Sequence, residues 1–270
     1  MGRLFRNQGG YRGETVDVTA VLEGCAAAAA SHGWEGEVVP VEGRPPLWIW
    51  RREGMGAAAG VARRRVYISA GIHGDEPAGV LAAQQLLAMD CWPAGVSVVL
   101  IPCLNPSGLQ LNRRENPDGL DLNRDYRHLR SPEVRAHVGW LEGQGSFDVS
   151  FCLHEDWEAA GFYLYELNPH GLPSLAEPML RAVEHVCPLD LSPVIEGRPA
   201  SGGLIRPAVD PESRPEWPEA FWLVQHGKTR LSYTLESPSD YPLAMRVDAL
   251  VAGVRAALEA WTSVGPAPVG

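Results

Sequence analysis

The sequence lacks any apolar run that approaches the ~18 residues needed for a membrane-spanning helix. Its first residues, MGRLFRNQGGYRGE, lack the apolar core of a signal peptide. Cysteine is scarce, since the chain has five, an odd number, and no CxxC spacing occurs. We therefore expect reduced, buried thiols in a cytoplasmic protein that has no membrane partner.

Positive charge is also in short supply, because 23 basic residues face 33 acidic ones and the net charge is −10. A surface that binds nucleic acid needs clustered Lys and Arg, so nucleic acid is not an expected partner. Arginines do gather between Arg113 and Arg135, which favours a small anionic ligand, whereas the triplet at 63–65 fits a solvated turn before a strand. The apolar fraction of 45% excludes a disordered chain, and 270 residues are compatible with one large domain.

Short apolar runs alternate with helical patterns along the chain. Strands are predicted at 46–52, 66–72, 96–103, 147–153 and 230–235. Helices are predicted at 16–32, 77–89, 173–186 and 242–262, a loop or hairpin at 54–60, a long irregular polar stretch at 105–135 and a Pro-rich excursion at 188–218. Continuous apolar strands need cover on both faces, so we predict an α/β fold with a mixed, mostly parallel central sheet and helices on both faces.

Polar, mostly ionisable residues follow four of the predicted strands. His73 comes directly after 66–72, Asn105 after 96–103, His154 after 147–153 and Glu236 after 230–235. In open α/β sheets, ligands bind beyond the carboxyl ends of the strands. These ends are therefore the expected place of a functional site.

His73 and Glu76 are three residues apart at a strand-to-helix junction, and Gly74 permits the tight turn that brings them together. His154 would complete a set of two His and one Glu with an open fourth position, which is the ligand pattern of a catalytic zinc site. Alternatively, His73 could cap the following helix and His154 could be a hydrogen-bonded residue at a strand end. Because both histidines follow predicted strands in the same way, a shared metal site is favoured over these two separate roles. The remaining histidines considered have no partner at ligand spacing and are expected at the surface or in structural roles: His128, His137, His170, His185 and His226.

The motifs resemble those of the M14 family of zinc carboxypeptidases in order and spacing, from about residue 66 to 240. They are GIHGDE at 71–76, NPSG at 105–108, RENPDGLDLNR at 114–124, LHED at 153–156 and TLESP at 234–238. The segment 153–166 is most similar to intracellular bacterial members, and the HGDE and DLNR elements are shared with succinylglutamate desuccinylases and aspartoacylases. The resemblance implies a zinc carboxypeptidase-like fold with a single catalytic domain over residues 1–270.

The resemblance also implies a role for each matching residue. His73, Glu76 and His154 would bind Zn²⁺, with Asp121 accepting a hydrogen bond from the ring N–H of His73 unless it is simply a turn residue. Asn123 and Arg124 would bind the terminal carboxylate of the substrate, since a guanidinium matches a carboxylate in bidentate fashion. Arg114, with Arg113 as the neighbouring candidate, would stabilise the developing oxyanion. Glu236 would act as general base.

The predicted function is a zinc-dependent metallocarboxypeptidase that hydrolyses the C-terminal peptide bond with a metal-activated water, Glu236 being the general base. Its substrate would be a peptide, or an N-acyl amino acid, with a free carboxylate. The alternative is a zinc-dependent deacylase or amidase that acts on N-acyl amino acids or cell-wall peptides. A third hypothesis, a catalytically inactive peptide-binding module, is disfavoured by the complete ligand set and Glu236.

The substrate preference stays open at the level of sequence. The specificity pocket is expected within 188–226, where basic, acidic and aromatic side chains mix: Arg198, Arg206, Asp210, Glu212, Trp217 and Trp222. Asp156 and Glu158 could add negative potential near the metal, although a solvated loop is the simpler interpretation. The tyrosine that covers the substrate in the family has no matching position, since Tyr233 and Tyr241 are not at the expected spacing.

Overall fold

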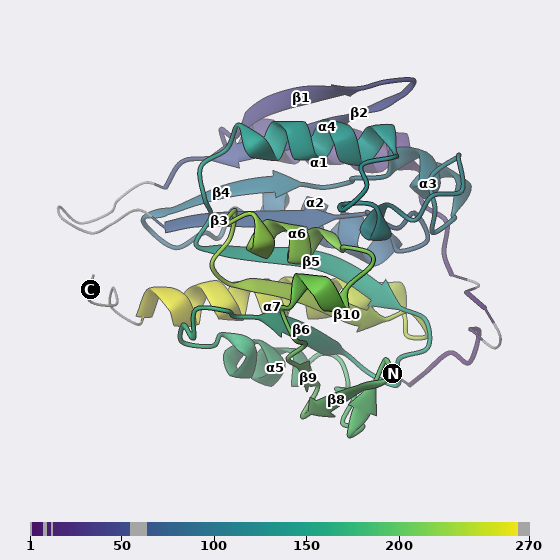
Figure 1. Cartoon of the computed structure of the whole chain (residues 1–270), viewed down its shortest axis with the longest axis vertical. Helices are drawn as coiled ribbons and strands as arrows, with labels where there is room; N and C mark the ends of the chain where they lie inside the picture. The colour runs from purple at the N-terminus through teal and green to yellow at the C-terminus, as the bar shows by residue number, and fades with distance from the viewer. Residues whose placement is uncertain (1, 8–9, 12, 55–63, 264–270) are drawn as a thin grey trace.

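The computed structural model describes residues 2–7, 10–11, 13–54 and 64–263, so the loop predicted at 54–60 lies outside it except for Gly54. Within these residues, one sheet has the strand order β1-β2-β4-β3-β5-β10-β6-β9-β8-β7 (Figure 1). The strands are β1 Glu35–Val41, β2 Arg44–Arg52, β3 Arg64–Ala70, β4 Val96–Ile101, β5 Val149–Asp156, β6 Tyr163–Leu167, β7 Val194–Ile195, β8 Arg198–Ser201, β9 Leu204–Ile205 and β10 Ser232–Pro238.

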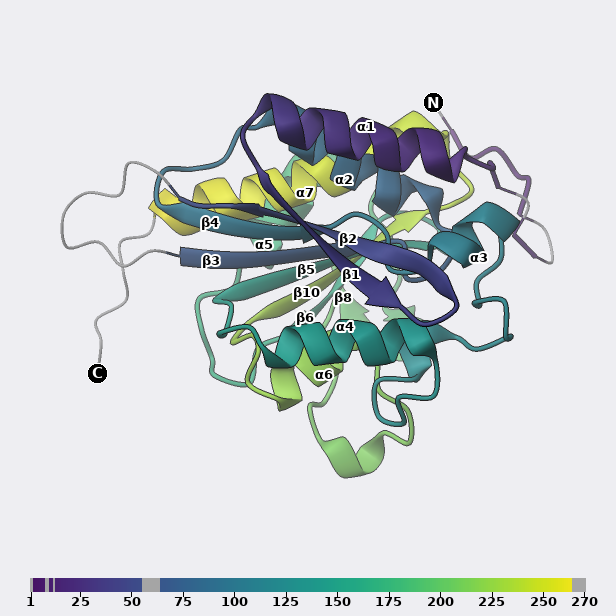
Figure 2. The same ribbon diagram turned by 90° about the horizontal axis from the view of Figure 1, so that it is seen from above.

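The helices are α1 Val18–Ser31, α2 Pro77–Met89, α3 Pro106–Leu111, α4 Pro132–Glu142, α5 Ala176–Glu184, α6 Glu219–Gln225 and α7 Leu243–Ser263, with 3-10 turns at Leu122–Arg124 and Pro211–Ser213. One face of the sheet carries α1, α2, α5 and α7, and the other carries α4 and α6 (Figure 2). The predicted mixed α/β fold with helices on both faces is thereby confirmed. No described helix combines the length and apolarity that crossing a bilayer requires.

Parallel pairing is concentrated at the centre, where β4, β3, β5 and β10 lie side by side. Antiparallel strands flank this centre, with β2 and β1 on one side and β6 on the other. The central strands are runs of apolar residues because both of their faces are covered. Their carboxyl ends consequently meet at one edge, where the sequence places its polar motifs.

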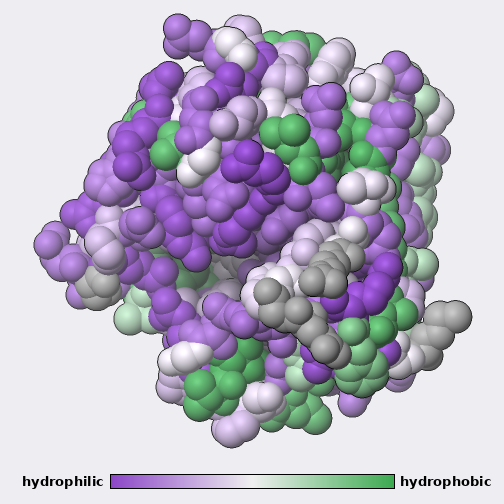
Figure 3. Space-filling view, turned by 90° about the vertical axis from the view of Figure 1, so that its right-hand side faces the viewer, coloured by the Kyte–Doolittle hydropathy of each residue, from purple (hydrophilic) through white to green (hydrophobic). Residues whose placement is uncertain are grey.

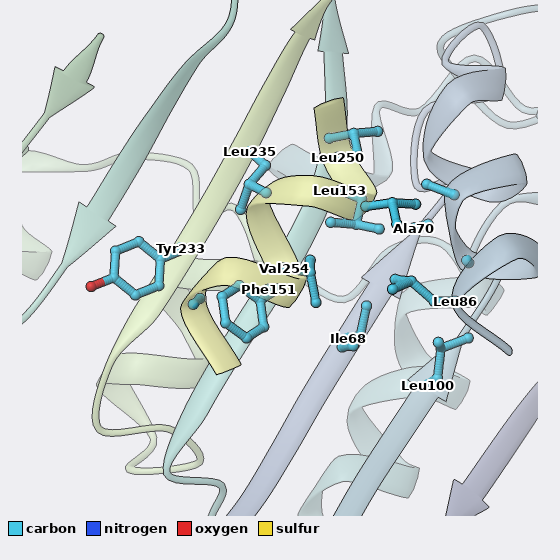
Figure 4. Close-up of a cluster of buried hydrophobic side chains, with 14 of the residues drawn as sticks. Ile68, Ala70, Leu86, Leu100, Phe151, Leu153, Tyr233, Leu235, Leu250 and Val254 are labelled. Carbon is cyan, nitrogen blue, oxygen red and sulfur yellow. The ribbon is translucent and has the colours of Figure 1, made fainter. Parts of the chain in front are cut away.

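The larger core lies between the central strands and α2 and α7. Figure 4 shows Ile68, Phe151 and Leu235 of the strands facing Val254 of α7. The Phe151 ring stacks on Tyr233 of the neighbouring strand, with ring centroids 5.9 Å apart. Burying a side chain of this size contributes about 1.5–3 kcal/mol, so this layer fixes β5 and β10 beside each other.

Three predicted boundaries are corrected by the structure. The stretch 105–135 is not irregular throughout, because it contains α3 and the start of α4. Asn105 caps α3, its Oδ1 accepting from Gly108 N at 2.9 Å, and Ser131 caps α4 in the same manner. The strand predicted at 230–235 runs to Pro238, so Glu236 lies within β10 rather than after it. His154 likewise lies within β5.

Candidate metal centre and active site

The first two candidate metal ligands lie on a turn that is pinned against α3. Gly71 has a φ of +62°, and its carbonyl oxygen accepts from Asn105 N at 2.8 Å. A Cβ on Gly74 would come within 1.9 Å of the carbonyl carbon of Gly108, so only glycine fits there. This close backbone approach fixes the turn that carries His73 and Glu76.

Three buried side chains meet at this turn. Both carboxylate oxygens of Glu76 face imidazole nitrogens, with His73 Nδ1 2.5 Å from Oε1 and His154 Nδ1 2.9 Å from Oε2. One ligand atom from each residue lies within 4.8 Å of the others. Two imidazole nitrogens and one carboxylate oxygen are the donor set of three-ligand zinc sites, so the residues present fit a zinc ion.

The local electrostatics also suit a cation. Burial alone would raise the pKa of Glu76, but His73 and His154 hold it below its ordinary value, so the carboxylate stays ionised. Burial lowers the pKa of His154, which keeps that imidazole neutral and able to act as a ligand. A buried carboxylate between two imidazoles is stabilised by a positive charge among them.

Asp121 occupies both of the roles weighed for it. Its Oδ1 lies 3.2 Å from His73 Nε2, which orients the ring so that Nδ1 faces Glu76. The same oxygen accepts from Asn123 N at 2.9 Å and caps the 3-10 turn. Its Oδ2 accepts from Arg114 Nε at 2.9 Å, a contact that sequence reasoning did not foresee. Asp121 therefore links the candidate metal ligand His73 to Arg114, the candidate for oxyanion stabilisation.

The candidate substrate-binding residues face one cavity of about 530 Å³ together with the three candidate ligands. Arg114, Asn123, Arg124 and Glu236 all line it, and hydrophilic side chains dominate the middle of the face at which β5 ends (Figure 3). The Oδ1 atom of Asn123 accepts from Glu219 N at 2.9 Å, which leaves its amide NH₂ for a ligand. The side chain of Arg124 is 43% exposed, and the one ion pair that it forms among the described residues joins its Nε to Glu216 Oε2 at 3.8 Å.

Glu236 lies beside the candidate ligands because of strand register. It pairs with His154 on β5 and with Tyr163 on β6. Its carboxylate has no hydrogen-bond or ion-pair partner among the described side chains and backbone groups. Burial, followed by the negative charges of Glu76 and Asp156, raises the pKa of Glu236 well above its ordinary value. A carboxyl group in such surroundings is suited to taking and returning a proton.

Sequence reasoning missed the ion pairs behind the ligands. Glu155 donates its backbone N–H to Glu76 Oε2 at 3.2 Å, and its carboxylate accepts from Ala78 N and pairs with the fully buried Arg246. Arg246 also pairs with Glu14. Glu155 is the sequence signal that could have revealed these ion pairs, because it is an acidic residue in a strand that is otherwise buried. A buried charge needs a partner of opposite charge.

The structure separates the candidates proposed for substrate preference. Arg198 lines the cavity, as do Asp156 and Glu158, whereas Arg206 pairs with Glu166 at 2.7 Å outside it. The other four candidates of this region do not line the cavity: Asp210, Glu212, Trp217 and Trp222. Tyr233 and Tyr241 do not line it either, and the tyrosines that do are Tyr11, Tyr163 and Tyr165.

Comparisons with known proteins agree with the resemblance seen in the motifs. The family model of the succinylglutamate desuccinylase/aspartoacylase catalytic domain matches residues 62–171. Carboxypeptidase SOL1 of Arabidopsis thaliana is 31% identical over 115 residues, which are 34% of this chain and 23% of that protein. Murein peptide amidase A of Escherichia coli is 33% identical over 143 residues, which are 51% of this chain and 56% of that protein. The chain thus spans about half or less of the length of these relatives.

Solved structures extend the match to most of the chain. A structure from Shewanella amazonensis, described as a candidate metallopeptidase, has a TM-score of 0.75 at 23% identity and covers 90% of this chain and 93% of that one. A metallo-carboxypeptidase structure from Burkholderia cenocepacia shares the fold as well, with a TM-score of 0.66 at 19% identity, and covers 92% of this chain and 70% of that one. At these identities the likeness concerns the fold, and the predicted carboxypeptidase-like fold is confirmed.

Proposed function

The chain is a relative of the metal-dependent carboxypeptidases and of the succinylglutamate desuccinylase/aspartoacylase catalytic domain, and we propose that it is a zinc-dependent metallocarboxypeptidase. Its substrate would be a peptide with a free terminal carboxylate, cleaved by one catalytic domain over residues 1–270. The observation that carries the proposal is the union, in one cavity, of the His73–Glu76–His154 set with Glu236 and Arg124. The five unpaired cysteines support a reducing, cytoplasmic compartment.

His73, Glu76 and His154 would hold the zinc ion. When bound, zinc supplies positive charge that polarises a carbonyl group and lowers the pKa of water to about 7. The N₂O donor set and its burial support this assignment, as does the orientation of His73 by Asp121. Zinc favours such mixed nitrogen and oxygen ligands.

Arg124 and the amide of Asn123 would bind the terminal carboxylate, which positions the last peptide bond toward the ligands. Glu236 would take a proton from the attacking water and deliver it to the leaving amine nitrogen as the C–N bond breaks. Arg114, whose Nη1 lies 3.6 Å from Glu76, would donate to the carbonyl oxygen as negative charge develops there. The hydrolysis consumes one water molecule and releases two products.

The test is Glu236→Gln, which preserves shape and removes the proton acceptor. We expect kcat to fall roughly 10²- to 10⁴-fold with zinc content unchanged. The matched control is Glu177→Gln, because Glu177 lies at the surface on α5 and its ion pair is with Arg181 of the same helix. Metal analysis of the purified protein accompanies the assay. Wild-type turnover by Glu236→Gln, or full activity after complete removal of metal, would overturn the proposal.

A second candidate, a zinc-dependent amidase or deacylase on cell-wall peptides or N-acyl amino acids, is favoured by two of the matches. One relative is named a peptide amidase, and the matching family model describes an acylase domain. Such an enzyme would use the same ligands and Arg124. A panel of dipeptides, N-acyl amino acids and cell-wall peptides distinguishes the two candidate functions. Hydrolysis of N-acyl amino acids or cell-wall peptides, with no hydrolysis of dipeptides, would select the amidase or deacylase.

A further inference from the structure

The N-terminal segment, residues 3–14 as far as the structure describes them, is fastened to the turn between β10 and α7. Asp240 of this turn is buried, and its carboxylate accepts from Arg3 Nε at 3.2 Å. The same carboxylate accepts from the backbone N–H groups of Phe5 and Arg6 at 3.1 and 2.8 Å. One buried carboxylate thus holds the start of the segment against the end of the strand that carries Glu236.

Glu14 is the second attachment of this segment. One of its carboxylate oxygens pairs with Arg6, and the other pairs with Arg246 of α7. Arg246 also pairs with Glu155 of β5, and the side chains of both residues are fully buried. Because a guanidinium presents several donors in a rigid fork, Arg246 can bind both carboxylates at once. It therefore joins the N-terminal segment to the strand that carries His154.

Glu155 contacts the candidate ligand Glu76 and the helix that follows it. The backbone N–H of Glu155 donates to Glu76 Oε2 at 3.2 Å, and its carboxylate accepts from Ala78 N in the first turn of α2. A buried carboxylate is strongly destabilised when its partner is removed. Loss of the Arg246 charge would therefore disturb Glu155 and, with it, both contacts that fix the position of Glu76.

The segment reaches the cavity as well, since Tyr11 lines it together with the three candidate ligands. Burial, followed by the charge of Glu155, raises the pKa of Tyr11, and the charges of Arg246 and Glu14 act on the same hydroxyl. The phenol consequently lies beside the Glu14–Arg246–Glu155 chain of ion pairs. Docking of the segment and the structure around Glu76 thus share one set of contacts.

We propose that Arg246 and Glu14 are positioning residues for the zinc ion. The docked N-terminal segment raises the zinc affinity because it holds Arg246 on Glu155 and thereby holds Glu76 in place. This inference rests on the zinc site of the proposed function. Coupling between two binding equilibria is reciprocal, so bound zinc must favour the docked segment by the same factor.

Chelator competition with the full chain tests the effect on zinc. Arg246→Met should lower the zinc affinity roughly 10- to 100-fold, which is the usual effect of removing a group that supports a metal ligand. Arg246→Lys keeps one positive charge and should recover part of this loss. Glu14→Gln leaves the Arg246–Glu155 pair in place and should lower the affinity about 5-fold or more. Arg181→Met, which breaks an exposed ion pair on α5, is the control that keeps the wild-type affinity.

Limited trypsin digestion tests the reciprocal effect, and it serves even if Arg246→Met does not fold. Cleavage after Arg3 or Arg6, followed by mass spectrometry, reports how often the segment opens. Zinc should slow this cleavage in the wild type by about the factor that Glu14→Gln costs in zinc affinity, and it should have little effect in Glu14→Gln. Cleavage after Arg181, within α5, reports opening of the rest of the fold and serves as the internal control.

The outcomes separate this inference from the proposed function. Unchanged zinc affinity in Glu14→Gln, or equal cleavage of the wild-type segment with and without zinc, would overturn the inference and leave the carboxypeptidase proposal standing. Zinc binding without hydrolysis of any peptide would refute the proposed function, and the affinities of the variants would still decide the inference. A chain that binds no zinc would refute both.

Discussion

Glu219 is a buried acid whose backbone N–H donates to Asn123, one of the candidate substrate-binding residues, and it gives a quantitative prediction. The residue is 1% exposed and begins α6. Its carboxylate accepts from the hydroxyls of Tyr67 at 2.6 Å and Ser69 at 2.9 Å, and Tyr67 is in turn bonded to His137. Burial raises the pKa of Glu219 from 4.5 to about 7. The proton thus stays on this carboxyl in the folded protein over a range where it is lost from the unfolded chain.

The sign and size of the effect follow from linkage. Between pH 4.5 and about 7 the unfolded state releases a proton that the native state retains, so the contribution of Glu219 to stability falls as pH rises. Glu219→Gln has no such proton and keeps a hydrogen-bonding group of the same shape. Across this range the free energy of unfolding of the wild type should therefore decrease by about 3 kcal/mol relative to that of Glu219→Gln.

Chemical denaturation of both proteins from pH 4.5 to 8, at constant zinc and ionic strength, measures this difference. Other titrating groups contribute equally to both curves and cancel. Glu177→Gln, an exposed carboxylate on α5, should instead follow the wild type. Parallel curves for wild type and Glu219→Gln would refute the reasoning, because the proton would then be bound equally in both states.

Three further predictions concern the ligands and the core. Asp121→Ala removes the acceptor from His73 Nε2 and should lower zinc affinity roughly 10- to 100-fold in a chelator competition. An unchanged affinity would contradict the orienting role of Asp121. Gly74→Ala places a Cβ 1.9 Å from Gly108. This substitution should lower the zinc content and should lower the free energy of unfolding, measured with denaturant, by about 1–3 kcal/mol. Wild-type values of both would show that the turn can shift. Phe151→Ala should cost about 3–5 kcal/mol of unfolding free energy, and a loss below 1 kcal/mol would mean that the core closes over the cavity.

The central strands, and the meeting of His73, Glu76 and His154 at their ends, could be predicted from the sequence because their signals are local. Runs 66–72, 96–103 and 147–153 are apolar on both faces, and each strand end is marked by polar residues. His137, expected at the surface or in a structural role, is buried between Tyr67 and Tyr126, and burial lowers its pKa to about 3. Of the two alternatives predicted for His137, a surface position and a structural role, the structural role is therefore correct.

The outer parts of the fold depend on contacts that the sequence does not display. β1 carries Glu35, Glu37 and Pro40 and forms only because β2 pairs with it. β7, β8 and β9 are two to four residues long and exist as additions to the edge at β6. α4 and α6 are short helices whose caps, at Ser131 and Pro218, lie in stretches that look irregular by composition. Arg214 reaches the cavity only through this folding of 206–218, so its place there could not be inferred from spacing.

The two halves of the cavity are built on different kinds of backbone. His154 and Glu236 are held by the continuous ladder between β5 and β10, whereas Arg198 and Arg214 extend from two- to four-residue strands and a 3-10 turn. Amide hydrogens of β5 and β10 should exchange only on global opening, and those of 206–214 much sooner. Substitutions in 198–214 should accordingly disturb the fold less than substitutions in the ladder that holds His154 and Glu236.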